Sequence, residues 1–516
     1  MPCEQVFAGL NTISMKYTFR ISIIVCTVIF ACTNSKRETW QGECPNSHDI
    51  GTIEIMPSLD RNALRVLFTV ETAQRLDSYI RYWEYTGTDT PPPTSQIFYS
   101  PICKKRKKHE LMLVNIKPET KYNFNVVIQN KVCKTHSKTY DFTSPKMPAW
   151  LPFYANADSL KDINFNGYVH FHSRMKLGYL YLANSKGELV WYKKVPMTIK
   201  VSKFTNASTF LTILSDDTLR FASGNKIAEI DLFGQLLYHY DSDEKGEETI
   251  FHHEIDYDMD GNLMTLISEK RVVDLSGIGG NKQDTIKGDG ILVMNKKDEV
   301  IWKWSVFDVM NPSNYKNILN ERHDWLHANA LCQDSVGNYL ISFRNNSQIW
   351  KIEKGTGRVM WKLGGDEDDF NLPDNLKFHG QHNVHFNKDG HLVFLDNGNK
   401  LVKPGFYNQL KKEKRYGAFM KENSTGFTSR QLTFNIDDNA LKAILVDEAV
   451  YNPEFLTKSQ GSSQHINEDL LLFCSTNSNS IVFANSSGEC LGRIPLERPS
   501  YRAQYIPELY STSYVK

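Results

Sequence analysis

The chain has 516 residues, more than one hydrophobic core usually supports, so we expect one large domain and a smaller one. Its 60 lysines and arginines nearly balance its 59 acidic residues, and the formal charge of +1 excludes the bulk charge of a protein that binds nucleic acid or an acidic polymer. Aromatic residues make up 12% of the chain, and Gly, Asn and Asp fall mostly in turns between short apolar runs, which predicts a β-rich protein.

An apolar segment follows two basic residues near the amino terminus. Lys16 and Arg20 precede the run 21–31, which is too short to span a bilayer comfortably as a helix. The pattern is typical of a secretion signal. Met15 is then a candidate for the true start.

The end of this segment resembles a bacterial lipobox. Residues 29–32 read IFAC, and in a lipobox the cysteine becomes the lipidated first residue after cleavage. We therefore expect residues 1–32 to be a leader and Cys32 to carry lipid. This places the protein in the bacterial cell envelope, facing the periplasm and anchored to the membrane. An ordinary signal peptide and an uncleaved anchor are the alternatives.

Cysteines beyond the leader can pair if the chain is exported to an oxidising compartment. Cys103 and Cys133 flank two neighbouring strands of the expected small domain, and we predict a disulfide between them. Cys474 and Cys490 flank a hairpin near the end of the chain and form the second predicted pair. Cys44 and Cys332 are left over.

The small domain is expected at residues 45–146, where short strands alternate in polarity. The stretch HELMLVNIKPETKYNFNVVIQ resembles the strand, turn and tyrosine strand of a fibronectin type III-like β-sandwich. Four residues take the expected places in that pattern: Leu113, Pro118, Thr120 and Tyr122. The basic run KKRKKHE at 104–110 is predicted to be a solvated hairpin loop, with a membrane or polyanion contact as the alternative.

Residues 150–516 consist of strands in groups. Six segments each show a strand, a tight turn, a second strand and a further turn, and they open near residues 166, 201, 251, 324, 380 and 461. A spacing of about 40 residues with four strands per unit is typical of propeller blades. We therefore predict an all-β chain with a six-bladed β-propeller. Longer insertions at 271–289 and 401–428 are expected to form rim loops.

Three blades place a polar residue at one position relative to their turn. Counting back eight positions from the turn glycines at 261, 337 and 390 gives His253, Asn329 and His382. The first strand of a propeller blade lines the central channel, so equivalent positions of neighbouring blades should converge there. His252 and His327 lie within two residues of these positions, and Arg344 follows on the next strand of its blade.

Two other interpretations of these histidines were weighed. A single histidine in a strand is more often a structural residue than a catalyst, but the recurrence in phase and the nearby Arg344 favour an anion-binding site. Histidine is also a common metal ligand. The chain has no HExxH spacing and no acidic residue in phase with the three histidines, so we predict neither a metal nor another cofactor.

The segments DWLHANAL, ISFRNNSQIWKIEKGTGRVMWKLGG and GQHNVHFNKDGHLVFLDNGN resemble the bacterial arylsulfotransferase family. The segment TSRQLTFNI is similar to a Ser-Arg strand of that family. The likeness extends from about residue 50 to the end and implies an N-terminal β-sandwich joined to a six-bladed propeller. It also implies transfer of a sulfuryl group from an aryl sulfate to a phenol through a sulfohistidine, without an activated nucleotide sulfate or a cofactor.

The same resemblance implies roles for the residues in phase. His382 would be the nucleophile, and His327, Asn329 and Arg344 would bind and polarise the sulfuryl oxygens. His252 or His253 would be the remaining histidine, and phase favours His253. A neutral imidazole, with an ordinary pKa of about 6.5, is an adequate nucleophile near neutral pH.

Alternatives to sulfuryl transfer between phenols stay open. The same cluster could serve an aryl sulfate hydrolase, in which water is the acceptor, or could be structural in an envelope propeller that only binds a ligand. The partners expected are a small phenolic sulfate donor and a phenol acceptor, and a homodimer is compatible with the sequence. The segment after DNGN lacks the cysteine pair of some family members, so no dedicated disulfide-forming partner is implied.

Overall fold

The computed structural model describes residues 43–57, 62, 64–151, 160, 163–216, 222–315, 317–398 and 428–509. From Cys44 onward these residues form one compact unit. The predicted leader with Cys32, and residues 401–427 of the second insertion, lie outside the described residues. Within the described part, no helix has the length and apolar character needed to cross a bilayer.

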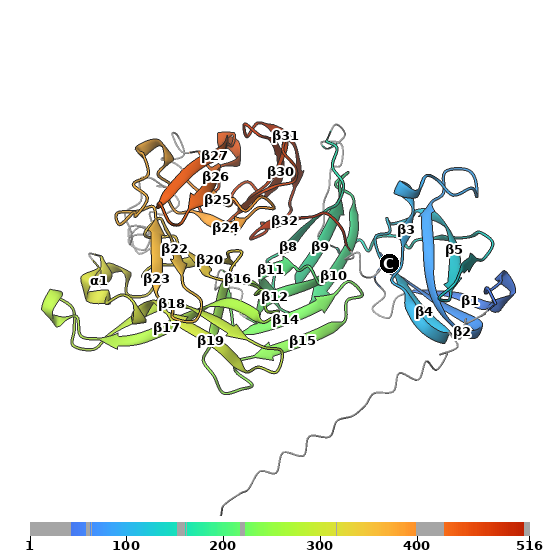
Figure 1. The fold of residues 1–516 in the computed structure, drawn as a ribbon, viewed down its shortest axis with the longest axis horizontal. Helices are drawn as coiled ribbons and strands as arrows, with labels where there is room; N and C mark the ends of the chain where they lie inside the picture. The colour runs from blue at the N-terminus through green and yellow to red at the C-terminus, as the bar shows by residue number, and fades with distance from the viewer. Residues whose placement is uncertain are drawn as a thin grey trace, which may run out of the picture. The chain divides into compact units, whose positions relative to one another are not determined.

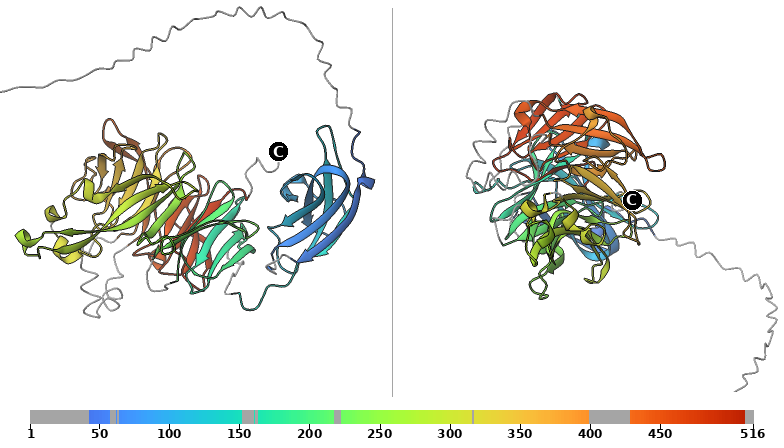
Figure 2. Two further views of the ribbon diagram at one scale, coloured as in Figure 1. Left: turned by 90° about the horizontal axis from the view of Figure 1, so that it is seen from below. Right: turned by 90° about the vertical axis from the view of Figure 1, so that its left-hand side faces the viewer.

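Seven strands form the N-terminal sheet: β1 (Ile50–Pro57), β2 (Val66–Glu84), β3 (Phe98–Tyr99), β4 (Cys103–Leu113), β5 (Lys121–Gln129), β6 (Lys134–His136) and β7 (Tyr140–Thr143). The long strand β2 joins them, because β1 and β4 pair with opposite edges of its first half and β3 and β5 with its second half. All seven strands therefore belong to one curved sheet, drawn in blue in Figure 2. The predicted fibronectin III-like sandwich is not confirmed.

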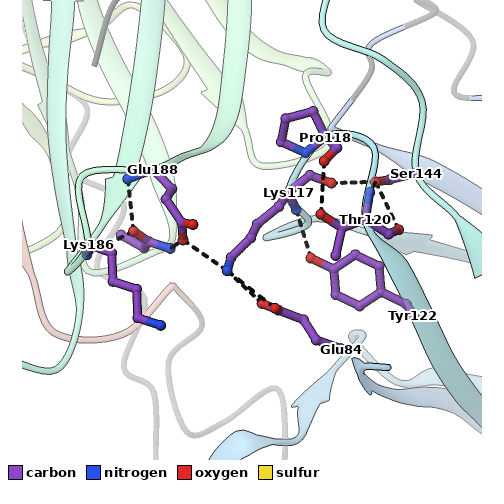
Figure 3. Close-up of polar contacts among 9 residues, drawn as sticks. Glu84, Lys117, Pro118, Thr120, Tyr122, Ser144, Lys186 and Glu188 are labelled. Atoms are coloured by element: carbon purple, nitrogen blue, oxygen red, sulfur yellow. Dashed lines mark hydrogen bonds and ion pairs between the residues drawn. The ribbon is translucent and has the colours of Figure 1, made fainter. Parts of the chain in front are cut away.

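An aromatic core lies inside this sheet. The ring of Phe68 lies 4.9 Å from that of Phe124 and 5.5 Å from that of Phe142, both edge to face. At the corner before β5, the hydroxyl of Tyr122 accepts a hydrogen bond from the backbone N–H of Lys117 at 2.8 Å (Figure 3). The Lys117 side chain in turn bridges Glu84 of β2 and Glu188 of the first blade, at 3.0 Å from each carboxylate (Figure 3).

The disulfide of the N-terminal sheet differs from the prediction. Cys44 is bonded to Cys133, with the Cα atoms 5.7 Å apart. The predicted Cys103–Cys133 pair is wrong, because Ser78 of β2 pairs with Cys103 on one edge and with Ile128 of β5 on the other. Strand β2 therefore separates Cys103 from the turn that carries Cys133.

The predicted pair near the end of the chain is also wrong. Cys474 and Cys490 are both free. Cys474 lies on β29 (Leu470–Ser475) and Cys490 on β31 (Cys490–Pro495), and strand β30 (Ser480–Asn485) pairs with both and stands between them.

Six further sheets form the propeller, which confirms the predicted blade number (Figure 1). The first three contain, in turn, β8 (Tyr168–Ser173), β9 (Gly178–Asn184), β10 (Leu189–Val195) and β32 (Ala503–Ile506); β11 (Thr198–Phe204), β12 (Thr209–Ser215), β14 (Lys226–Asp231) and β15 (Leu236–Asp241); and β13 (Ser223–Gly224), β16 (Ile250–Tyr257), β17 (Leu263–Val273), β18 (Asp284–Met294) and β19 (Val300–Ser305).

The fourth to sixth blades contain β20 (Ala328–Gln333), β21 (Tyr339–Phe343), β22 (Gln348–Ile352) and β23 (Val359–Leu363); β24 (His382–Phe386), β25 (Leu392–Asp396), β26 (Arg430–Asp437) and β27 (Lys442–Val450); and β28 (Ser462–His465) with β29, β30 and β31. The single α-helix of the described part is α1 (Ile318–Glu321), and short 3-10 helices are η1 (Ser47–Asp49), η2 (Thr94–Gln96), η4 (Ser276–Ile278), η5 (Val306–Asp308), η6 (Pro312–Asn314), η7 (Asp374–Leu376) and η8 (Pro453–Phe455).

The two ends of the propeller sequence meet in the first blade. Strand β32, near the carboxyl terminus, pairs antiparallel with β8, and Ala503 faces Phe171. The ring is thus closed by backbone hydrogen bonds between segments more than 300 residues apart. The predicted rim loop at 271–289 is instead an extension of β17 and β18, which stay paired as far as Val273 and Asp284.

Tryptophans on outer strands join neighbouring blades. The indole N–H of Trp191 donates to the carbonyl of Leu232 at 2.7 Å, and that of Trp304 donates to Gly357 at 2.9 Å. Trp361 repeats the pattern towards Asp438 of the fifth blade at 2.9 Å. Each of these buried rings brings its polar atom to the outer turn of the next blade, so the apolar contact between blades leaves no indole N–H without a partner at these three positions.

Candidate active site

The inner strands of three neighbouring blades are bulged at the residues that the sequence places in phase. The pairing shifts between His252 and Ile255 in β16, between Ala328 and Ala330 in β20, and between His382 and His385 in β24. A bulge inserts an extra residue into one strand and re-aims the side chains beside it. Figure 1 shows β16, β20 and β24 around the middle of the ring. The bulges in these strands turn the side chains beside them out of the regular alternation.

Backbone conformation marks the same places. His253 and His327 both have φ of +59°, and Asn383 has φ of +55°. For residues with a side chain, this left-handed region is sparsely populated, and strain of this kind persists where the surrounding structure fixes it. Two of the three bulged strands, β16 and β24, thus hold a non-glycine residue in a strained conformation at or beside a predicted site residue, and His327 directly precedes the third, β20.

His382 is 1% exposed. One of its ring nitrogens faces hydrogen-bond acceptors and the other faces a hydrogen-bond donor. Nδ1 lies 2.6 Å from Oδ1 of Asn397 and 3.0 Å from the carbonyl oxygen of Gly380, which are both acceptors. Nε2 accepts a hydrogen bond of 3.1 Å from the backbone N–H of Gln460. The proton is therefore on Nδ1, and the lone pair of the ring is on Nε2.

The amide of Asn397 is itself fixed in one orientation. Its Nδ2 donates to the carbonyl oxygens of Thr457 at 2.7 Å and Gln460 at 3.0 Å. Both partners can only accept, so Oδ1 must be the atom that faces His382. Asn397 and the backbone of Gln460 together contact both sides of the imidazole and determine its tautomer.

Histidines 252, 253 and 327 form a contiguous cluster. The Nδ1 atoms of His252 and His253 are 2.9 Å apart, so one of them donates to the other. The ring of His253 lies 4.9 Å from the ring of His327. Beneath them, Asp289 lies 3.4 Å from Nε2 of His252 and accepts the backbone N–H of Ala328.

The carboxylate of Asp324 fixes the orientation of the His327 ring. Nδ1 of His327 lies 2.9 and 2.8 Å from the two carboxylate oxygens, so Nδ1–H donates and Nε2 is left for the site. Burial acts to raise the pKa of Asp324, but His327, together with the charges of Lys287 and Arg344, holds that pKa well below its usual range. The pair is the arrangement by which a carboxylate orients a histidine and stabilises its protonated form.

Three arginines border the histidines. Arg344 follows β21, and its backbone N–H donates to the carbonyl of His327 at 3.0 Å. Arg502 donates to the carbonyl of Asn329 at 2.7 Å and to the carboxylate of Glu254. Arg174 donates to Oε1 of Gln460, and its guanidinium lies 5.8 Å from the centre of the Tyr501 ring.

The electrostatics of the site favour neutral rings at His252, His253 and His382, beside fixed cations. Burial lowers the pKa of His252 to about 3 and holds the pKa values of His253 and His382 well below the usual range. Positive charge on Arg344 lowers the pKa of His382 further. The site can therefore present an unprotonated nucleophile and still attract an anion.

A metal is not supported by the geometry of the described residues, among which no group of three or more His, Cys, Asp or Glu side chains could hold an ion. Cavities are found away from the cluster. One of about 440 Å³ lies over β23 and the acidic loop 366–369, and one of about 470 Å³ lies beside Trp150 and Tyr192.

The sequence model of the arylsulfotransferase family matches residues 160–489, which is well over half of the chain. The chain belongs to the arylsulfotransferase family. The matched range includes strands of all six propeller sheets, without β31 and β32, and every predicted catalytic residue. A search of the curated proteins found no match for this chain.

Solved structures resemble this chain only distantly. A protein of unknown function from Bacteroides caccae is 12% identical with a TM-score of 0.39, over 67% of this chain and 100% of its own. Virginiamycin B lyase from Staphylococcus aureus is 13% identical with a TM-score of 0.30, over 58% and 71%. A streptogramin B lyase is 12% identical with a TM-score of 0.33, over 68% and 90%. Scores this low carry no argument about activity.

One predicted site residue, Asn329, differs from the others in what its side chain contacts. Asn329 is fully buried, and its Nδ2 donates to the carbonyl of Gln381 at 2.7 Å. The side-chain amide of Asn329 therefore fixes the backbone of Gln381, the residue before His382. Oδ1 of Asn329 is buried with no hydrogen-bond partner.

Several residues that contact the site, and one further position in phase with it, were not predicted from the sequence. Asn397 lies within the DNGN segment and could have been noted as a conspicuous amide after β25. Lys200 stands eight positions before Ser208, which has φ of +62° in the turn of the second blade, and its strand is bulged at that position. The count used for the glycine turns would have found it. Nothing in the neighbouring sequence indicates that Gln460, Arg174 or Arg502 belongs to the site.

Proposed function

We propose that the protein transfers a sulfuryl group from an aryl sulfate ester to a phenol through a sulfohistidine at Nε2 of His382. The observation that carries the proposal is the position of the lone pair: Nδ1–H donates to Asn397, and Nε2 is unprotonated. A neutral imidazole nitrogen is a competent nucleophile. No nucleotide sulfate is required, because the ester supplies its own leaving group.

In the first half-reaction, Nε2 forms a bond to sulfur while the bond from sulfur to the phenolic oxygen breaks. The Gln460 N–H gives up its hydrogen bond to Nε2, because that lone pair becomes the N–S bond. The imidazole gains positive charge and Nδ1–H donates more strongly to Asn397. In the second half-reaction, the oxygen of an acceptor phenol bonds to sulfur, the N–S bond breaks, and the neutral ring returns.

The phenolic proton requires an acid that becomes a base. His327 suits this role, since Asp324 holds its Nδ1–H and stabilises the imidazolium form. The imidazolium protonates the leaving phenolate through Nε2 and, once neutral, takes the proton of the acceptor phenol. Protons balance over the two half-reactions.

Charge on the sulfuryl oxygens requires fixed donors. Sulfuryl transfer should resemble phosphoryl transfer in having a loose transition state, with charge spread over the three peripheral oxygens. The guanidinium of Arg344 is the group we propose to bind them, because it acts on both His382 and Asp324 electrostatically. Removing one such donor typically costs about 10²–10³ in kcat.

The experiment mixes the purified chain from Glu43 onward with 4-methylumbelliferyl sulfate, with and without phenol, beside His382→Ala. Fluorescence that rises with phenol, together with phenyl sulfate as product and loss of both in the variant, is expected. Without phenol, intact-mass analysis should show one added SO3 group, mapped to His382. His239→Ala is the matched control, because His239 is exposed on the outer strand β15.

Three results would contradict the proposal. Release that does not depend on phenol, with inorganic sulfate as product, would identify a hydrolase on the same residues. If a folded chain has no activity towards several aryl sulfates, the remaining interpretation is a propeller that only binds a ligand. If His382→Ala keeps the wild-type activity, His382 is not the nucleophile.

A further inference from the structure

Five consecutive basic residues, Lys104–Lys108, form an exposed segment at the start of β4, which we call the basic strand. All five side chains are exposed, and none forms an ion pair with an acidic side chain in the described part of the chain. The chain as a whole has a net charge of only +1. The basic strand is therefore a local concentration of positive charge that overall composition hides.

The fold keeps both faces of this strand in solvent. Strand β4 pairs with β2 alone among the described strands, so its other edge is open. The pairing of β4 with β2 shifts on either side of the contact between Leu76 and Arg106, and this irregularity breaks the usual alternation of buried and exposed residues. Acidic neighbours are few: Glu71 faces Lys108, and Asp77 accepts the backbone N–H of Lys105.

A second group of basic residues lies near the first. The turn between β5 and β6 carries Lys131 and Lys134 on either side of Val132, which is 60% exposed. Lys134 pairs with Gln129, and Gln129 pairs with Asp77 of β2. The two groups are thus separated by three strand spacings, about 15 Å.

The disulfide fixes the chain at Cys44, just before the first strand, to the same turn. Cys133 lies between Val132 and Lys134 and is bonded to Cys44. The predicted lipidation site, Cys32, precedes Cys44 by twelve positions, a span of at most about 40 Å when extended. A lipid at Cys32 would hold this end of the N-terminal sheet near a membrane.

We propose that the basic strand, with Lys131 and Lys134, binds the anionic headgroups of a phospholipid membrane. The interaction does not depend on sulfuryl transfer. A lipid at Cys32 would bring the sheet to the membrane, and a basic surface there adds electrostatic attraction to anionic headgroups. The exposed Val132 between two lysines fits an interface in which a small apolar side chain enters the headgroup layer.

Lysines on an edge strand also discourage pairing with other sheets. That role needs only one or two charges on the open edge. It does not account for five in succession, or for Lys131, which lies on the turn before β6. The two explanations predict different behaviour of charge-neutral variants.

The experiment measures cosedimentation of the chain from Glu43 onward with phosphatidylcholine vesicles, with and without phosphatidylglycerol. The variant replaces Lys104, Lys105, Arg106, Lys107 and Lys108 by glutamine. We expect binding only to the anionic vesicles, weakened by salt, and at least about tenfold lower in the variant, since each basic residue near an anionic surface contributes roughly fivefold. Lys131→Gln with Lys134→Gln should lower binding by a smaller factor.

The matched control replaces five exposed lysines of the propeller by glutamine: Lys270, Lys282, Lys297, Lys388 and Lys442. It has the same change of net charge and should bind anionic vesicles like the wild type. Equal losses in both variants would overturn the proposal, as would a basic-strand variant that binds normally but aggregates. Retention on heparin without vesicle binding would also overturn it and indicate a soluble polyanion. Near-ultraviolet circular dichroism confirms that the variants are folded, and the double Lys131/Lys134 variant provides a test if the larger one is not.

Discussion

The amide oxygen of Asn397 lies 2.6 Å from Nδ1 of His382, and the amide nitrogen of Asn397 donates to two carbonyl oxygens. This amide therefore fixes which nitrogen of His382 has the lone pair. The relationship joins the end of β25 to the beginning of β24, within one blade, and connects that blade to residues 457 and 460 before the sixth.

Asn397→Leu should lower kcat while the substrate still binds. The variant cannot accept the Nδ1–H bond, which strengthens as the ring becomes positive, and a hydrogen bond to a charged group contributes about 1.5–3 kcal/mol. A loss of this size corresponds to roughly 10- to 100-fold in kcat. Steady-state kinetics with 4-methylumbelliferyl sulfate and phenol measure it. Asn439→Leu on the outer turn of the fifth blade is the control, and equal kcat values for the two variants would exclude the proposed role.

Asp324→Asn should slow donors according to their leaving group. Without the carboxylate, His327 loses the partner that holds its Nδ1–H and stabilises the charged ring, so the general acid is less available; aryl sulfates of weakly acidic phenols should lose about 10²–10⁴ in kcat/KM, and those of strongly acidic phenols less. The measurement is the slope of log kcat/KM against the pKa of the leaving phenol. A variant whose line is merely displaced, with the wild-type slope, would show that Asp324 does not act through proton transfer.

Asp289 should make stability fall as pH rises through the acid range. Burial raises the pKa of Asp289 to about 6, against an ordinary value of 3.8. Between these pH values the folded state binds more protons than the unfolded state, so the free energy of unfolding decreases with increasing pH, by at most about 3 kcal/mol. The decrease is complete above pH 6. Relative to wild type, Asp289→Asn should therefore be more stable at pH 7.5 than at pH 4, on the order of 1–3 kcal/mol.

Denaturant unfolding at the two pH values measures this difference. Asp389→Asn is the control, because Asp389 is exposed in the turn after β24. If the two variants shift in parallel with pH, the buried carboxyl of Asp289 does not titrate as expected.

The disulfide should stabilise the N-terminal sheet substantially. It joins residues 89 positions apart, and a closed loop of that length contributes up to about 4–5 kcal/mol in the chain-entropy account. Cys44→Ser with Cys133→Ser should lower the free energy of unfolding by about 2–4 kcal/mol, whereas Cys103→Ser should not.

Thiol titration tests the connectivity itself. Six cysteines follow residue 43, and two of them form the disulfide, so the denatured, unreduced chain should have four thiols. Two thiols would point to a second disulfide, and peptide mapping would then have to find Cys44 bonded to Cys133 for the pairing to stand.

Sequence reasoning reached much of the candidate site because propeller blades repeat. The turn glycines at 261, 337 and 390 put His253, Asn329 and His382 in phase, and the inner strands bearing them are bulged at or beside those positions. The count treated the three as equivalent, however, and the bulges make them different. His382 has a lone pair on Nε2, whereas Asn329 is turned to the carbonyl of Gln381.

The disulfide pairing, by contrast, could not be predicted from the sequence. Cys103 and Cys133 flank neighbouring strands in the sequence, but pairing depends on which edge of β2 each strand occupies. That choice is made by contacts between strands, and nothing near either cysteine encodes it. Cys474 and Cys490 are kept apart for the same reason, by β30.

By itself, the sequence determined the all-β class, the six blades, the family and the strands that carry the reactive side chains. Hydrophobic alternation and turn residues are local, so they can be counted along the chain. Tertiary structure alone decided the ring closure between β32 and β8, the tautomer of His382 and the bond from Cys44 to Cys133. Each of these depends on partners that are close in space and far apart in sequence, or on a bulge that re-aims a side chain, and neither leaves a periodic signal.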